Sequence, residues 1–135
     1  MLTVQNIENN IFYFTKTHEW VRFTDNGTAF VGVTEYLTEK KKTASFINLC
    51  DEGDYLNAGD TAGDIEYSKG IADIYSPVSG TVERVNDDVL NHPEKIGFDP
   101  YGSWLIELSE PMIRRRLLTE KEYKEYIDCE EQFDD

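Results

Sequence analysis

The residue best placed to carry chemistry is Lys69, in the short turn formed by residues 68–70. Strand-like runs flank this turn, residues 61–67 before it and residues 71–78 after it. Gly70 allows the positive φ that a tight reversal requires, so the pattern predicts a β-hairpin with Lys69 at its exposed tip. An exposed lysine on a rigid turn can be acylated by an enzyme and then carry a swinging arm, although a turn lysine can also be only a solubilising charge.

The other reactive side chains give weaker signals. His18 has no nucleophile motif around it, so we expect a structural role. Cys50 and Cys129 are far apart and lack the spacing of a metal site, which indicates reduced thiols. Two basic clusters, residues 40–42 and 114–116, hold six of the thirteen Lys and Arg residues, and they could guide docking or lie on solvated faces. We therefore expect neither a catalytic residue nor a metal site.

Length and charge narrow the class of protein. The 135 residues fit a single domain, residues 1–135. The formal net charge of −14 argues against binding to nucleic acid, because phosphate recognition depends on Lys and Arg. No apolar run approaches membrane-spanning length, and residues 1–10 resemble neither a secretion signal nor a transit peptide. We expect a cytoplasmic protein, or a mitochondrial matrix protein if the chain is eukaryotic and processed.

Short strands separated by turns predict a mainly β fold. Residues 12–23 and 28–33 are rich in β-branched and aromatic residues and flank Asn26-Gly27, which favours a hairpin with a type I′ turn. Further strands are expected at residues 44–49, 81–85 and 104–108. Many short strands of this kind indicate a flattened β-barrel or sandwich with its core at about residues 12–109.

Helices are expected at three places. Thr34 can cap a short helix that runs to about Lys41, and Pro93 can occupy the first position of another. The third covers about residues 119–129, where Thr119 and Glu122 have the spacing of a capping box. In that last helix, Leu118 can pack against Tyr123, and one face carries Tyr123, Tyr126 and Ile127.

A series of motifs in fixed order points to a known family. In chain order the motifs are residues 17–21, 32–36, 52–54, 66–69 and 73–80, Asn86, and residues 99–102 and 104–105. This series resembles the glycine cleavage H-protein family, the lipoyl carriers of the biotinyl/lipoyl-carrier superfamily. The resemblance implies a barrel-sandwich hybrid fold with short helices and a C-terminal helix. It also places the lipoylated lysine of the family at Lys69.

The resemblance implies a carrier and not an enzyme. Lipoate would be attached to Lys69 by a lipoate ligase or lipoyl transferase. The arm would take an aminomethyl group from a pyridoxal-phosphate glycine decarboxylase, present it to a folate-dependent aminomethyltransferase, and be reoxidised by dihydrolipoyl dehydrogenase. In the family a carboxylate meets the amine of the loaded arm, and the matching residue is Glu19; the alternative for Glu19 is a solvated strand carboxylate. Thr17, Tyr36 and Asp73 match other positions near the arm.

Some residues near the arm depart from the family pattern. Tyr36 stands where histidine is frequent, and Gly70 replaces an alanine. Residues 41–43 read Lys-Lys-Thr where a Leu-Gly-Asp turn is usual, and this loop should border the arm. Two alternatives therefore stay open: a lipoyl carrier that serves another oxidative pathway, such as sulfur oxidation or a protein-modification system, and an interaction module that is never lipoylated.

Overall fold

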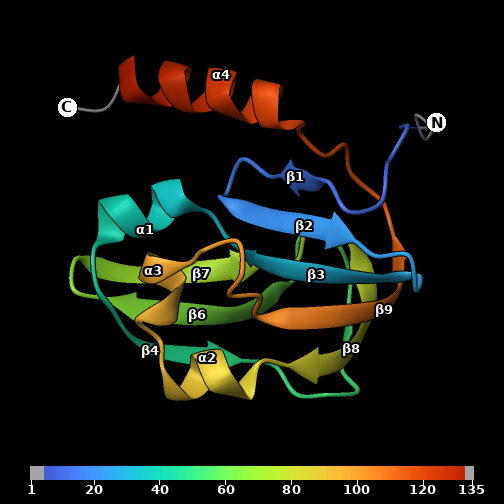
Figure 1. Ribbon diagram of the computed structural model, residues 1–135, viewed down its shortest axis with the longest axis horizontal. Helices are drawn as coiled ribbons and strands as arrows, with labels where there is room; N and C mark the ends of the chain where they lie inside the picture. The colour runs from blue at the N-terminus through green and yellow to red at the C-terminus, as the bar shows by residue number, and fades with distance from the viewer. Residues whose placement is uncertain (1–4, 133–135) are drawn as a thin grey trace.

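Two antiparallel sheets form most of the structure, a computed structural model that describes residues 5–132 (Figure 1). The larger sheet has the strand order β1-β2-β3-β9-β8-β5, and the smaller has the order β4-β6-β7. The strands are β1 Phe12–Phe14, β2 Glu19–Phe23, β3 Thr28–Val33, β4 Ala44–Leu49, β5 Tyr55–Leu56, β6 Thr61–Tyr67, β7 Gly70–Tyr75, β8 Ser79–Val85 and β9 Ile106–Met112. The predicted mainly β sandwich is confirmed.

The core lies between the inward faces of the two sheets. Successive side chains of a strand point to opposite faces, so each strand contributes alternate residues. The buried residues include Val21, Val31, Ile106 and Leu108 from the larger sheet and Ile47, Ile65 and Ile74 from the smaller. The fold thus places one face of each sheet in this core, and on the other face of the larger sheet a second cluster buries Phe14, Trp20 and Tyr123.

The predicted single strand over residues 12–23 is wrong. It is divided into β1 and β2, which pair with each other around a turn that ends at His18 with φ +73°. The predicted type I′ turn is also wrong, because among residues 5–132 the only non-glycine residues with positive φ are Asn10, His18, Lys42 and Glu110. Gly27 alone supplies the left-handed conformation there, with φ +79°. His18 therefore takes, in the first hairpin, the place that Gly27 takes in the second.

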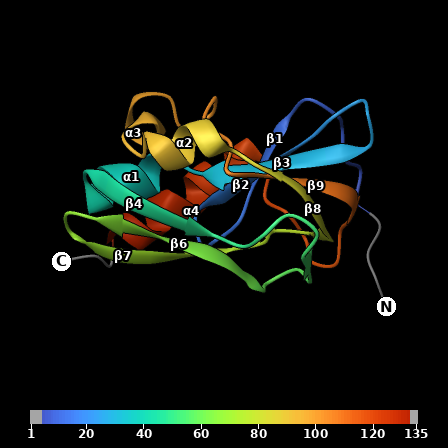
Figure 2. The same ribbon diagram turned by 90° about the horizontal axis from the view of Figure 1, so that it is seen from below.

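The lysine hairpin forms as predicted. Strands β6 and β7 pair up to Tyr67 and Gly70, and Gly70 has φ +120°. The turn between them lies at one end of the molecule, at the left of Figures 1 and 2. Strand β7 ends at Tyr75, earlier than predicted, because Ser76 donates its N–H to Asp60 instead and Pro77 has no N–H to donate.

Three short helices lie between the strands. They are α1 Glu35–Lys41, α2 Asp87–Asn91 and α3 Lys95–Phe98. The Thr34 side chain accepts from Leu37 N, as predicted. The helix expected to start at Pro93 begins two residues later, as α3, and α2, which Asn86 caps, was not predicted. Among residues 5–132 no helix is long and apolar enough to cross a membrane.

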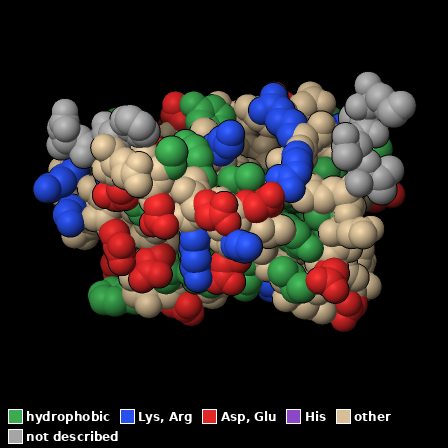
Figure 3. Space-filling view, turned by 90° about the horizontal axis from the view of Figure 1, so that it is seen from above, with side chains coloured by type: hydrophobic (Ala, Val, Ile, Leu, Met, Phe, Trp, Pro, Cys, Tyr) green, Lys and Arg blue, Asp and Glu red, His purple; other side chains and the backbone are tan. Residues whose placement is uncertain are grey.

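Helix α4, Glu120–Gln132, lies across the first strands at the top of Figure 1. Its capping box is formed, because Thr119 N donates to Glu122 Oε1 at 2.9 Å and Glu122 N donates to Thr119 Oγ1 at 3.2 Å. Tyr123 stacks on Phe14 with ring centroids 4.6 Å apart and shares a cluster with Leu118. Asp and Glu side chains gather along the outer surface of this helix (Figure 3).

Candidate functional site

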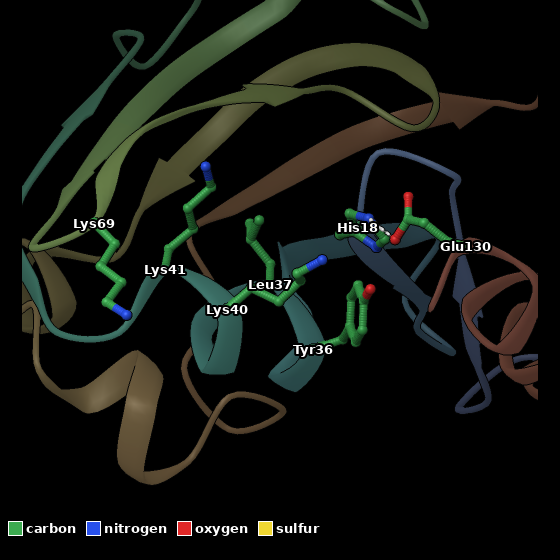
Figure 4. Close-up of a pocket in the computed structure, with 7 residues that line it drawn as sticks. All are labelled: His18, Tyr36, Leu37, Lys40, Lys41, Lys69 and Glu130. Carbon is green, nitrogen blue, oxygen red and sulfur yellow. Dashed lines mark ion pairs between the residues drawn. The ribbon is translucent and has the colours of Figure 1, made fainter. Parts of the chain in front are cut away.

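Lys69 lies exposed at the hairpin tip and lines a groove with a volume of about 580 Å³ (Figure 4). The other residues that line it are His18, Tyr36, Leu37, Lys40, Lys41 and Glu130. The groove thus brings together Lys69 and Tyr36, two of the predicted site residues. Lys69 and the His18–Glu130 pair lie toward opposite ends of it, with Tyr36 between them (Figure 4).

The backbone of the hairpin tip is fixed by the last residue of α1 and the loop that follows it. Lys69 N donates to Lys41 O at 3.1 Å, and Ser68 N donates to Thr43 O at 2.8 Å. Thr43 N donates in return to Ser68 Oγ at 3.2 Å. The loop at residues 41–43 therefore borders the lysine, as predicted. The Lys69 side chain thus stays exposed while the backbone N–H groups of Ser68 and Lys69 are both held by hydrogen bonds.

The far end of the groove is closed by α4. His18 Nε2 lies 3.4 Å from Glu130 Oε2, and its Nδ1 lies 2.8 Å from the hydroxyl of Tyr123. Burial lowers the pKa of His18 although Glu130 opposes the shift, so the ring is neutral at pH 7. Desolvation, together with Glu130 and Glu131, raises the pKa of Tyr36 to about 12. These contacts give His18 a structural role, and neither ring supplies a charge at pH 7.

Glu19 and Thr17 lie in a second hollow, together with Tyr75. Glu19 is 1% exposed, which rules out the solvated strand carboxylate. It accepts hydrogen bonds from Thr15 Oγ1 at 2.6 Å, from Thr17 Oγ1 at 2.5 Å and from Tyr75 N at 3.2 Å. Desolvation raises the pKa of Glu19, although these hydrogen bonds act in the opposite direction. The carboxylate is thus pre-positioned, and a cation beside it would favour its ionised form.

Two features of this second hollow were missed from the sequence. Thr15 was overlooked; it lies opposite Glu19 across the turn between β1 and β2, where Thr15 N donates to Glu19 O at 3.0 Å. Arg115 also lines the hollow and packs on Gly59, where an added Cβ would lie 2.5 Å from a guanidinium nitrogen. The basic border of the hollow comprises Lys16, Arg115 and Arg116, and Lys and Arg side chains border a hollow beside α4 in Figure 3.

Strand β7 connects the two hollows. Lys69 immediately precedes it and Tyr75 ends it, so they are roughly 20 Å apart at about 3.3 Å per residue. Because β7 is an edge strand, its outer N–H groups are not paired within the sheet, and Glu19 accepts from one of them at Tyr75. Asp73 is exposed on β7 and is not among the described residues that line either hollow, so its contact with an arm stays a prediction.

The geometry suits a point of attachment at one end of β7 and a cation-binding group at the other. Lys69 offers an amine that can be acylated, and Glu19 offers a buried carboxylate at the other end of β7. Among residues 5–132, no group of three or more His, Cys, Asp and Glu side chains could hold a metal ion.

Known proteins resemble the chain over most of its length. Residues 12–130 match a family model described as glycine cleavage H-protein. A glycine cleavage system H protein from Lachnoclostridium phytofermentans is 39% identical over 121 residues, which cover 90% of this chain and 94% of that protein. A probable glycine cleavage system H protein from Thermoplasma acidophilum is 45% identical over 96 residues, which cover 71% of this chain and 77% of that protein. The crystal structure of a glycine cleavage system H protein from Mycobacterium marinum matches with a TM-score of 0.79 and 29% identity, covering 89% of this chain and 96% of that one.

Proposed function

Because the chain belongs to the glycine cleavage H-protein family, we propose that its Lys69 is the attachment point of the family's lipoyl arm. Members of this family carry an aminomethyl group on lipoyl-lysine and do not catalyse a reaction themselves, so this protein is a carrier and not an enzyme. This favours the aminomethyl carrier over the other oxidative pathways and the unmodified interaction module.

The observation that carries the proposal is the exposed Lys69 amine on a backbone held by Lys41 and Thr43. The site fits the group, because the space around the turn is open: apart from the chain neighbours of Gly70, the one described atom within 4 Å of an added Cβ there would be Lys41 Nζ, at 3.7 Å. When bound, the lipoyl group would supply a disulfide that accepts the aminomethyl group, and the dithiol left after the group departs would be reoxidised. The protein supplies a fixed point of attachment and a shielded place for the cargo.

Glu19 is the residue that we assign to the cargo. Thr15 and Thr17 hold one of its oxygens and Tyr75 N holds the other, so the carboxylate is oriented before any ammonium arrives. A charge-assisted hydrogen bond from Glu19 would retain the ammonium, and its burial would keep water from the carbon beside it. The partners would be glycine decarboxylase, the folate-dependent aminomethyltransferase, dihydrolipoyl dehydrogenase and a lipoate ligase or lipoyl transferase.

Peptide mass spectrometry after treatment with a lipoate ligase tests the proposal. One lipoyl increment is expected on Lys69, and Lys69→Arg should remain unmodified. Lys41→Arg is the matched control, because the Lys41 amine also lies beside the tip and its loss should leave the increment in place. Modification of Lys69→Arg, or of another lysine in the unaltered protein, would overturn the assignment.

A further inference from the structure

A row of exposed side chains crosses the outer face of the smaller sheet directly beside the lysine tip. Phe46 of β4 pairs with Glu66 of β6, which pairs with Ile71 of β7. Phe46 is 51% exposed and Ile71 is 64% exposed, so two large apolar side chains flank one carboxylate in water. Scattered surface apolar residues are common, but these two are aligned in register, and Ile71 lies two residues from Lys69.

The next row on this face carries two carboxylates. The next row along the strands is Asn48, Asp64 and Asp73, with Asn48 Nδ2 donating to Asp64 Oδ1 at 3.1 Å. Strands β4, β6 and β7 contain no Lys or Arg between their first and last residues. A partner that covers this face must therefore offer apolar contacts for the first row and basic groups for the carboxylates.

The position of the row distinguishes between the partners of a lipoyl carrier. Before modification Lys69 has no arm, so an enzyme that acylates it must bring its acyl carbon to about 3–3.5 Å from Nζ. Ile71 follows Lys69 by about 7 Å along the strand, so an enzyme that approaches the tip lies beside the end of this row. Partners that act on the finished arm meet its far end and need not cover the row.

We propose that the row Phe46–Glu66–Ile71 is the docking surface for the enzyme that attaches lipoate to Lys69; this rests on the proposed function. In that reaction an amide bond forms between Lys69 Nζ and the carboxyl carbon of lipoate. The bond from that carbon to its activating group breaks, the activating group departs with the bonding electrons, and the ammonium of Lys69 gives up two protons. The row binds the enzyme and takes no part in the bond changes.

The first test is the rate of lipoylation, followed by intact mass with a purified lipoate ligase. Phe46→Thr and Ile71→Thr keep a residue suited to strands while removing apolar surface, and each should lower the apparent second-order rate about tenfold. Tyr55→Thr is the matched control, because Tyr55 is 56% exposed on β5 of the other sheet and should leave the rate unchanged. Equal rates for all four proteins would overturn the inference.

A competition experiment separates docking from misfolding and from chemistry. Lys69→Arg cannot be acylated but keeps the row, so it should inhibit lipoylation of the unaltered protein, whereas Lys69→Arg combined with Ile71→Thr should inhibit about tenfold less. Absence of inhibition by Lys69→Arg would overturn the docking surface. If the unaltered protein is never modified at Lys69, the proposed function fails instead.

A last measurement decides which partner uses the row. Ile71→Thr can be lipoylated to completion with excess ligase and then loaded by glycine decarboxylase. We expect its loading rate to equal that of the unaltered protein. A fall in loading as large as the fall in lipoylation would show a surface shared by several partners and overturn the assignment to the attaching enzyme.

Discussion

Glu19→Gln should preserve the fold and lipoylation but shorten the lifetime of the loaded arm. Glutamine has almost the shape of glutamate, so its Oε1 can accept from Tyr75 N while its amide donates to the hydroxyls of Thr15 and Thr17, which can turn to accept. The hydrogen bonds around the side chain are therefore kept. What is lost is the negative charge, and with it the charge-assisted hydrogen bond to an ammonium.

The size of the effect follows from the burial of Glu19. A hydrogen bond to a charged group contributes about 1.5–3 kcal/mol, and at 1% exposure little screening by water reduces it. If cargo is released only while the arm is out of the hollow, this corresponds to a roughly 10- to 150-fold faster release.

Stability gives an independent readout of the same substitution. Burial raises the folded-state pKa of Glu19 above its ordinary value of 4.5, so the folded protein binds more protons than the unfolded chain in the window above 4.5. The contribution of Glu19 to stability therefore falls as the pH rises through that window. Relative to the unaltered protein, Glu19→Gln should gain free energy of unfolding between pH 4.5 and the raised pKa, as measured by denaturant titration.

The assay for cargo is the release of formaldehyde and ammonia from proteins loaded to the same extent. Glu107→Gln serves as the control, because Glu107 is also a buried carboxylate but bonds Arg84 and Thr28 in the larger sheet. Its release rate should match that of the unaltered protein. Equal release from Glu19→Gln and the unaltered protein would remove Glu19 from the mechanism.

Three further predictions test other parts of the structure. Gly70→Val should slow lipoylation and cost about 1–3 kcal/mol, because φ is +120° there, whereas Gly53→Val, at φ +92° in a different turn, should cost stability without slowing lipoylation. Thr119→Ala should lower stability by about 1 kcal/mol in a thermal melt through loss of the cap, and an unchanged melt would contradict the capping box. His18 has a lowered pKa, so stability should fall as the pH drops below 6.5, and His18→Asn, which tolerates positive φ, should flatten that dependence; equal slopes would refute it.

Features that depend on a few neighbouring residues were predictable from the sequence. The caps at Thr34 and Thr119 and the positive φ of Gly70 follow from local hydrogen bonding and sterics. The α2 cap at Asn86 belongs to the same class, because two aspartates follow it in the first helical turn. That signal was present in the sequence, but α2 was not predicted from it.

Features that depend on distant contacts were not predictable. The burial of Glu19 requires Tyr75, which is 56 residues away in the chain. The turn before β2 requires the left-handed conformation of His18, as the next hairpin requires it of Gly27, but the contacts that hold the His18 ring come from Tyr123 and Glu130 of α4. Lys69, Tyr36, Glu19 and Thr17 were all named from motifs, but the division of these residues between two hollows became visible only in three dimensions.

The anchoring of the hairpin tip to Lys41 and Thr43 also sets how tightly the Glu19 hollow needs to bind. A group tethered to a fixed point by a short flexible link has an effective concentration in the millimolar range near its target. A hollow with a dissociation constant of about 1 mM, or about −4.1 kcal/mol, would then be occupied roughly half of the time. Such weak binding would shelter the cargo between encounters and still release it when an enzyme offers a better site.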